Sequence, residues 1–359
     1  MAVGRWKKTE GDIVNGTWFA LLLYCFILWA GVRRENRPRV SENLLIGKRI
    51  SVITSLIYSF MNDLTCNHKK VVIPSYAKIN LTLDVGDLRP DGYHEISSVL
   101  QTVSLADTLI LTRLPKGIAV SCSSPGVPDG RENLAYRALA EIEHLLPGGI
   151  QVEISKRVPS AAGLGGGSSN AAAALTGANM LYNFPLTDEQ LLTAAAQVGS
   201  DVPFFILGGT AHISGRGEKV TPVPQLPRFW VVLVKPTFDV STAEIYGLYQ
   251  KKGDNLYTPR ILRALEKGDL EGILSSLGND LEEVTVGLHP EIAALKEQLL
   301  ELGALVAVMA GSGPTVYGVF AGHKEAFQAG MKLQEAAGVD VFVCRTLSAG
   351  EVSKEERNG

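Results

Sequence analysis

A glycine-rich stretch followed by two serines is the part of the sequence best suited to chemistry. Gly163 and the glycines at 165–167 lie between a predicted strand at 150–154 and a predicted alanine-rich helix at 169–182. Where side chains are absent, consecutive backbone N–H groups can point at one anion, and the next helix adds the unpaired N–H groups of its first turn. The stretch therefore suits a polyphosphate; the structural alternative is a flexible surface loop.

Two familiar nucleotide motifs are excluded at this stretch. A Walker A loop needs a lysine that is absent here, and Ser168 stands where the dinucleotide fingerprint has its last glycine or alanine. The hydroxyls of Ser168 and Ser169 can contact a phosphate or a metal ion. The residues that we assign to a phosphate-binding loop are Pro159, Ser160, Ala161, Ala162, Gly163, Leu164, Gly165, Gly166, Gly167, Ser168 and Ser169.

Two charged residues are candidates for acid–base chemistry. Asp201 is followed by Val-Pro-Phe-Phe, an apolar run that favours a partly desolvated and more basic carboxylate. The alternative is an aspartate that caps a helix or stabilises a turn. Lys78 lies on a predicted strand, where a lysine is more often a solvated edge charge than a catalytic group. Asn80, two residues further on, lies on the same face of that strand.

An aromatic pair and a second glycine stretch are weaker candidates. Tyr93 and His94 follow the turn-forming Pro-Asp-Gly at 90–92. By themselves they fit an exposed loop without a task. The Gly-Ser-Gly sequence at 311–313 can close over phosphates or form a tight turn.

The elements around these residues predict an α+β enzyme of two domains. Alternating apolar residues predict strands, and apolar residues three or four positions apart predict helices. Prolines at 222, 224 and 227 indicate a junction near residue 225, and the polar tail at 351–359 is expected to fray. The predicted strands are at 71–86, 97–111, 150–154, 229–234, 304–310, 315–320 and 339–343, and the predicted helices at 132–146, 169–182, 187–198 and 289–302.

Composition narrows the class of protein. The chain has 359 residues and a formal net charge of -3, which leaves no positive surplus to attract a nucleic-acid backbone. The four cysteines are scattered, as in an intracellular protein with reduced thiols, so a metal or disulfide framework is not expected. We therefore expect a cytoplasmic protein that does not bind nucleic acid.

Residues 1–70 differ in composition from the rest of the chain. They carry 11 lysines and arginines against 5 acidic residues, whereas the remaining residues carry 23 against 32. The uncharged segment at 17–32 precedes four arginines and, as a helix, spans about 24 Å, short of a hydrocarbon core of about 30 Å. Two interpretations fit: a membrane anchor that keeps the downstream chain in the cytoplasm, or an extension that is not native, with translation starting at Met61.

Several motifs resemble those of the GHMP kinase superfamily and cover roughly residues 72–350 in the expected order. The resemblance implies an α+β fold of two domains, a ribosomal protein S5 domain 2-like N-terminal domain at 71–225 and a ferredoxin-like C-terminal domain at 226–350. The motifs are Ser75–Asn80 with Arg89–Glu95, the loop Pro159–Ser169, the acidic motif Gly199–Phe204 and the second glycine loop Ala310–Pro314.

The resemblance also implies an activity, the ATP-dependent phosphorylation of the 2-hydroxyl of 4-diphosphocytidyl-2-C-methyl-D-erythritol in the non-mevalonate pathway of isoprenoid precursor biosynthesis. It makes Asp201 the general base and Lys78 the cation that keeps Asp201 ionised and stabilises charge on the substrate oxygen. It places Tyr93 and His94 at the cytosine. The other implied substrate-binding residues are Asn80 and, more weakly, Thr242 and Tyr246.

ATP is then the co-substrate, and Mg²⁺ is required to bridge its phosphates, with Ser168 as the candidate protein ligand. Three alternatives stay open at this point. Another GHMP-type kinase would act on a different alcohol, which the aromatic pair argues against. A non-catalytic nucleotide or sugar sensor would need neither Lys78 nor Asp201, and a membrane-tethered binding protein rests wholly on the segment at 17–32.

Overall fold

The computed structural model describes residues 69–251, 256–335 and 338–358, with side chains described up to residue 354. The apolar segment at 17–32 and Met61 lie outside these residues, so both interpretations of the extension stay predictions. No helix within the described ranges is long and apolar enough to cross a membrane. Cys122 and Cys344, the two cysteines in these ranges, are free thiols.

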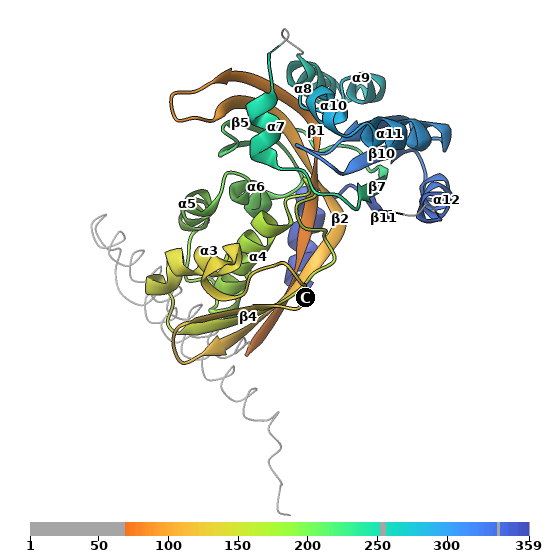
Figure 1. The fold of residues 1–359 in the computed structure, drawn as a ribbon. Helices are drawn as coiled ribbons and strands as arrows, with labels where there is room; N and C mark the ends of the chain where they lie inside the picture. Colours follow the sequence, from red (N-terminus) through yellow and green to blue (C-terminus); the bar gives the residue numbers. More distant parts are fainter. Residues whose placement is uncertain (1–68, 252–255, 336–337, 359) are drawn as a thin grey trace, which may run out of the picture. The chain divides into compact units, whose positions relative to one another are not determined.

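Two long antiparallel strands, β1 (Lys70–Leu88) and β2 (His94–Leu114), form the centre of sheet A (Figure 1). The middle of β1 is buried on both faces, because helices cover one face of sheet A and a second sheet covers the other. The pairing of β1 with β2 shifts register at residues 76–77 and again at 80–82. Such bulges re-aim side chains, and these two lie on either side of Lys78 and Asn80.

Five shorter strands complete sheet A. The order is β3-β4-β2-β1-β8, with β5 paired to β2 and β6 to β5. β8 comes from the later half of the chain and pairs in parallel with β1. The shorter strands are β3 (Ile118–Cys122), β4 (Gly149–Ser155), β5 (Thr210–Gly215), β6 (Lys219–Pro222) and β8 (Gly278–Asn279).

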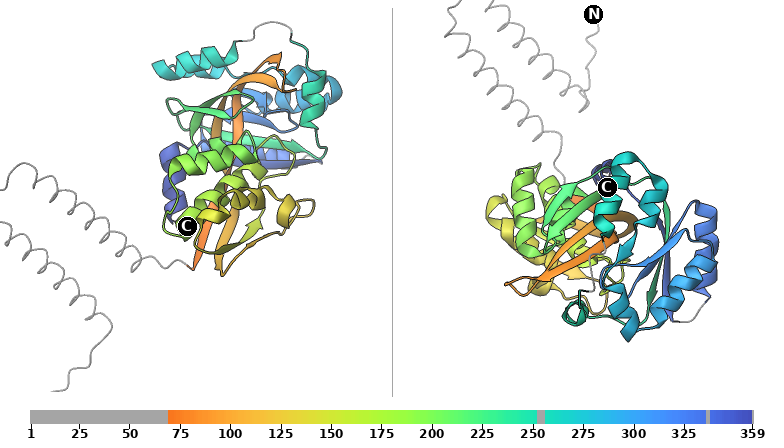
Figure 2. Two further views of the ribbon diagram at one scale, coloured as in Figure 1. Left: turned by 90° about the vertical axis from the view of Figure 1, so that its left-hand side faces the viewer. Right: turned by 90° about the horizontal axis from the view of Figure 1, so that it is seen from above.

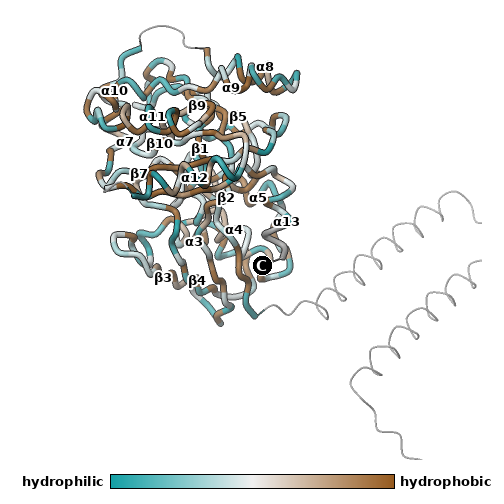
Figure 3. Tube along the Cα trace, turned by 90° about the vertical axis from the view of Figure 1, so that its right-hand side faces the viewer, coloured by the Kyte–Doolittle hydropathy of each residue, from teal (hydrophilic) through white to brown (hydrophobic). Residues whose placement is uncertain are grey.

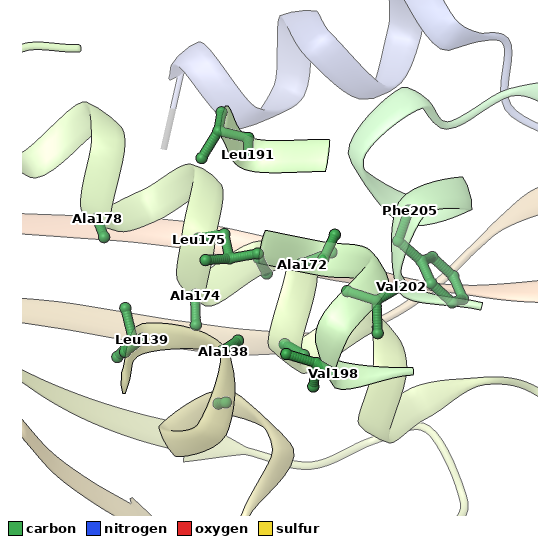
Figure 4. Close-up of a cluster of buried hydrophobic side chains, with 14 of the residues drawn as sticks. Ala138, Leu139, Ala172, Ala174, Leu175, Ala178, Leu191, Val198, Val202 and Phe205 are labelled. Carbon is green, nitrogen blue, oxygen red and sulfur yellow. The ribbon is translucent and has the colours of Figure 1, made fainter. Parts of the chain in front are cut away.

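Four helices pack on one side of sheet A: α3 (Leu134–Ile142), α4 (Gly166–Leu181), α5 (Asp188–Val198) and α6 (Val202–Leu207). The small residues of α4 let it approach the sheet closely, since a Cβ built on Gly177 would lie only 2.7 Å from Leu111. Figure 4 shows side chains of all four helices gathered in one cluster, including Leu139, Leu175 and Leu191. Removing these apolar surfaces from water holds the helical layer on the sheet.

Sheet B consists of four antiparallel strands in the order β11-β7-β10-β9. Alternation along β7 directs Val231 and Leu233 toward sheet A, and Val232 and Val234 toward helices α11 and α12. Sheet B is therefore an inner layer between sheet A and those helices (Figure 2). Its strands are β7 (Trp230–Pro236), β9 (Val306–Met309), β10 (Val316–Phe320) and β11 (Val339–Arg345).

The remaining helices surround these layers. Along the trace, brown hydrophobic stretches coincide with strands such as β7, whereas α8 carries teal hydrophilic turns (Figure 3). These helices are α7 (Thr242–Leu248), α8 (Tyr257–Lys267), α9 (Leu270–Ser275), α10 (Glu282–Leu288), α11 (Glu291–Glu301), α12 (His323–Gln334) and α13 (Ala349–Asn358).

The predicted elements and the α+β class are confirmed, with element ends moved by a few residues. The expectation that the polar tail frays is wrong for its described part. α13 forms there because Val352 is buried beside Leu347 and Glu351 pairs with Arg345. The predicted junction near residue 225 falls between β6 and β7, which belong to different sheets, but β8 returns to sheet A from beyond it. The division at 71–225 and 226–350 stays a prediction.

Candidate functional site

The glycine-rich loop connects β4 to α4 and continues into the helix. Gly166, Gly167 and Ser168 form the first turn of α4, whose N–H groups have no acceptor within the helix. Gly165 precedes that turn with a φ of 71°, in the left-handed region that favours glycine. Residues of the loop and of this turn line a cavity of about 570 Å³. A helix N-terminus beside a cavity can hold the negative charge of a polyphosphate.

A buried carboxylate fixes both ends of this loop. Asp107, on β2, is fully buried, and its Oδ1 accepts hydrogen bonds from the backbone N–H groups of Arg157 (2.7 Å) and Val158 (2.8 Å), just before the loop. Its Oδ2 accepts from Lys156 Nζ (2.5 Å) and from Nδ2 of Asn170 (2.8 Å), just after the loop. Charge-assisted bonds of this kind are strong, so the loop is held in place before any ligand binds.

The second glycine loop, at 310–314 between β9 and β10, lies directly against the first. A Cβ built on Gly163 would lie 2.2 Å from the carbonyl oxygen of Ala310, so only glycine allows the two loops to approach this closely. The hydroxyl of Thr242, at the start of α7, hydrogen-bonds Ser312 Oγ at 2.8 Å. The two loops and α7 therefore meet at one place.

Lys78 is buried, which excludes the solvated edge lysine. Its Nζ donates a hydrogen bond to Asn80 Oδ1 (2.7 Å) and lies 3.9 Å from Asp201 Oδ2. Burial lowers the pKa of Lys78, and the nearby Asp201 charge partly offsets that effect. The backbone N–H of Lys78 donates to the carbonyl of Leu164 (3.0 Å), which ties β1 to the glycine-rich loop.

Asp201 lies immediately before α6, and its side chain is 34% exposed. It makes no helix-capping hydrogen bond, so the capping role is not observed. The apolar residues that follow, including Val202 and Phe204, pack into the core, away from the solvent that still reaches the carboxylate. The desolvation expected from the apolar run is therefore only partial, and the carboxylate remains open to a ligand.

A second cavity, of about 690 Å³, adjoins the first, since Gly163, Gly165 and Thr242 line both. Lys78 and Asp201 line this second cavity next to the shared wall. The structure thus brings together residues from β1, the β1–β2 turn, α6 and α7. The predicted substrate-binding residues that line it are Asn80, Tyr93, His94, Thr242 and Tyr246.

Hydrogen bonds and ring contacts hold the aromatic residues of this cavity. Nδ1 of His94 lies 2.9 Å from the carbonyl oxygen of Gly86, and its ring is 5.9 Å from that of Tyr246. Burial, and then the Asp201 charge, raises the pKa of Tyr246, so its hydroxyl stays protonated. Tyr93 is exposed at the cavity mouth, with the Arg216 guanidinium 5.4 Å from its ring centre.

Three residues predicted to bind ligands use their side chains mainly for contacts within the protein. The side chain of Leu164 is buried in the core, and Ser169 accepts a hydrogen bond from Ser75 Oγ (2.7 Å), so neither lines the two cavities. Asn80 accepts from Lys78 and donates to Ser98 Oγ (3.0 Å), which leaves one amide N–H for a substrate. Its first task is to position Lys78.

Three residues near the site escaped the sequence reasoning. Arg216 lies on the β5–β6 turn, and a charged residue between two glycines was the available signal. Asp107 interrupts an apolar strand, which marks a buried carboxylate that needs partners. Asn279 carries no such mark, because the carbonyl groups to which it donates are about thirty positions away.

Comparison with known families first defines the class. The GHMP kinases N terminal domain matches residues 133–209, and the GHMP kinases C terminal domain matches residues 261–338. Two solved structures share this fold: the homoserine kinase from Cytophaga hutchinsonii (TM-score 0.66, 18% identity, 79% of this chain and 96% of that one) and L. major mevalonate kinase (TM-score 0.61, 19% identity, 78% and 97%). At these identities the likeness concerns the fold alone.

Nearer relatives narrow the assignment. The 4-diphosphocytidyl-2-C-methyl-D-erythritol kinase of Moorella thermoacetica is 48% identical over 284 residues, covering 77% of this chain and 99% of its own length. That of Pelotomaculum thermopropionicum is 45% identical, covering 76% and 96%. A crystal structure of 4-(cytidine 5'-diphospho)-2C-methyl-D-erythritol kinase superposes with a TM-score of 0.67 at 34% identity, covering 77% and 99%. The chain therefore belongs to the 4-diphosphocytidyl-2-C-methyl-D-erythritol kinase family of the GHMP kinases, as its motifs predicted.

Proposed function

We propose that the protein transfers the γ-phosphoryl group of ATP to the 2-hydroxyl of 4-diphosphocytidyl-2-C-methyl-D-erythritol. The observation that carries this proposal is the position of Lys78 and Asp201. They lie beside the wall between the 570 Å³ cavity of the glycine-rich loop (the loop-lined cavity) and the 690 Å³ cavity of Tyr93, His94 and Tyr246 (the aromatic-lined cavity). ATP phosphates in the first cavity and an alcohol in the second would meet at this pair. Phosphoryl transfer depends mainly on such positioning and on neutralising charge.

The chemistry follows from the two side chains. Asp201 takes the proton of the 2-hydroxyl, the hydroxyl oxygen bonds to the γ-phosphorus, and the bond to the β–γ bridging oxygen breaks to release ADP. Lys78, held by Asn80 and 3.9 Å from the Asp201 carboxylate, stabilises negative charge on the attacking oxygen. A non-catalytic sensor would not need Lys78 and Asp201 together, since binding requires no proton acceptor.

The tautomer of His94 supports a cytosine ring as part of the substrate. A carbonyl oxygen only accepts, so Nδ1 of His94 must donate to Gly86, and in the neutral ring Nε2 is then left as an acceptor. Cytosine presents an amino donor at the position where uracil presents an oxygen. His94 would therefore favour cytosine over uracil, with Tyr93 and Tyr246 providing ring faces.

Arg216 can supply positive charge for the diphosphate of the substrate. Arg216 lines the aromatic-lined cavity beside Tyr93 and is exposed, so we assign it to the diphosphate of the cytidylyl substrate. The described residues contain no cluster of three or more His, Cys, Asp or Glu side chains able to hold a metal ion. We therefore propose that Mg²⁺ binds through the ATP phosphates and the hydroxyl of Ser168, an oxygen ligand of the kind it prefers. When bound, it neutralises phosphate charge.

The test is ATP consumption with a panel of alcohols: the cytidylyl substrate, its uridylyl analogue, homoserine and mevalonate. We expect consumption with the cytidylyl compound alone and a phosphorus NMR signal from a monophosphate on its 2-oxygen. Consumption with homoserine or mevalonate would identify a different GHMP-type kinase, and equal consumption with the uridylyl analogue would contradict the assignment of His94. Nucleotide binding without consumption for any alcohol would identify a sensor.

A further inference from the structure

The second glycine loop is held from behind by one side chain. Asn279, at the end of β8, is buried, and its Nδ2 donates to the carbonyl oxygens of Met309 (2.8 Å) and Gly311 (2.7 Å). Its Oδ1 accepts from the N–H of Leu281 (3.0 Å), so the amide is fully engaged. Its two donated bonds therefore hold the Met309–Ala310 and Gly311–Ser312 peptide groups, and the bond from Leu281 holds the side chain itself.

In a trans peptide the N–H points opposite to the carbonyl, so holding the Gly311 carbonyl on the Asn279 side turns the N–H of Ser312 away from Asn279. Gly311 has a φ of 58°, and Gly311 and Ser312 both line this cavity. Within the described ranges, neither of their N–H groups donates to another residue. Successive N–H groups in such a turn form a concavity that attracts an anion.

This concavity lies at the reacting groups. A Cβ built on Gly311 would lie 3.6 Å from Lys78 Nζ and 3.4 Å from Asn80 Oδ1. The same turn contacts Gly163 of the first loop. That loop leads into the first turn of α4, which receives the polyphosphate in the proposed function. An oxygen of the phosphoryl group in transit would therefore be near both Lys78 and the two free N–H groups.

We propose that Asn279 is a positioning residue for phosphoryl transfer: by holding the Gly311 carbonyl it orients the Ser312 N–H group, beside that of Gly311, toward the developing negative charge of the transferring phosphoryl group. This rests on the proposed function. β8 links Asn279 to the strand that carries Lys78, since Asn279 pairs with Leu83 of β1. Donors aimed at developing charge raise kcat more than they tighten substrate binding.

The principal test is Asn279→Asp, which keeps the size and the acceptor oxygen but replaces the NH₂ donor by a second acceptor facing two carbonyl groups. At pH 8 we expect kcat to fall by about ten- to a hundredfold, while KM for ATP and for the alcohol changes by less than about threefold. Burial raises the pKa of such a carboxyl, and its protonated form donates one hydrogen bond. The ratio of variant to wild-type kcat should therefore rise by at least about threefold from pH 8 to pH 6.

Two further variants separate positioning from folding. Asn279→Ala removes the donors without adding charge, so its kcat should fall while its ratio to wild type stays flat with pH. Asn179→Asp is the matched control, since Asn179 is also buried and also spans a turn, accepting from Leu186 N–H (2.9 Å) and donating to its carbonyl (3.2 Å) far from both cavities. Its kcat ratio should stay flat and near one in the folded fraction.

Unchanged kcat in Asn279→Ala, a flat pH ratio in a folded Asn279→Asp, or a loss confined to KM would each overturn the inference. A wild-type enzyme that consumes no ATP with any alcohol would instead overturn the proposed function. The two failures are therefore distinguishable.

Discussion

Gly163→Ala probes the contact between the two glycine loops. At this position the added methyl group would lie 2.2 Å from the Ala310 carbonyl oxygen, whereas ordinary contacts begin at 3.4 Å, so one loop must move by about 1.2 Å. A shift of about 1 Å in an active site can cost roughly a hundredfold in rate. The left-handed φ of 73° adds a strain of about 1–2 kcal/mol. We expect kcat/KM to fall about a hundredfold.

The control for this variant isolates the contact from the strain. Gly117 has a similar φ of 80° but nothing within 4 Å of a built Cβ, so Gly117→Ala carries the strain alone. Both variants should lose a few degrees of melting temperature, and only Gly163→Ala should lose activity. Steady-state kinetics with the cytidylyl substrate and thermal melts of both proteins measure this. If Gly163→Ala keeps activity within about threefold of wild type, the two loops do not form one phosphate site.

Other predictions address the charges of the site and the fold. Asp201→Asn should lower kcat by about two to four decades while ATP affinity, measured by calorimetry, is retained; near-normal turnover would show that the proton goes elsewhere. Because burial lowers the pKa of Lys78, kcat should decrease with rising pH already below pH 10.5. Lys78→Arg should move this alkaline decrease of kcat to higher pH. Thermal melts over the same pH range distinguish this loss from unfolding, because a folded protein with reduced kcat identifies titration in the site. Gly165→Val should weaken ATP binding, because its Cβ would lie 2.7 Å from Phe205; unchanged affinity in a folded variant would remove this loop from the ATP site. Backbone and arginine partners lower the pKa of Glu351 to about 2, so its stabilising effect is present above about pH 4.5 and is lost as pH falls toward 2; Glu351→Gln should flatten acid melts there.

Local patterns were enough to predict seven strands, four helices and the chemistry of the loop, but not α6–α10, α12 or the short strands β3, β5, β6 and β8. Alternation along 71–86 predicts the central strand because one residue in two faces each side of a sheet, whatever its neighbours are. The glycines at 163–167 predict an anion site because backbone N–H groups and a helix start are properties of the local chain. Motif order along the chain was enough to predict the family.

Contacts between distant segments decided the rest. Lys78 is a buried partner of Asp201 and not an edge charge, because sheet B and the glycine loop cover β1 from segments more than eighty residues away. The tail becomes α13 because Val352 finds an apolar contact beside Leu347, which its own polar sequence does not reveal. Asn279 orients a loop thirty residues further on. Burial, pKa and hydrogen-bond geometry depend on which surfaces meet, and the composition of one segment does not specify that.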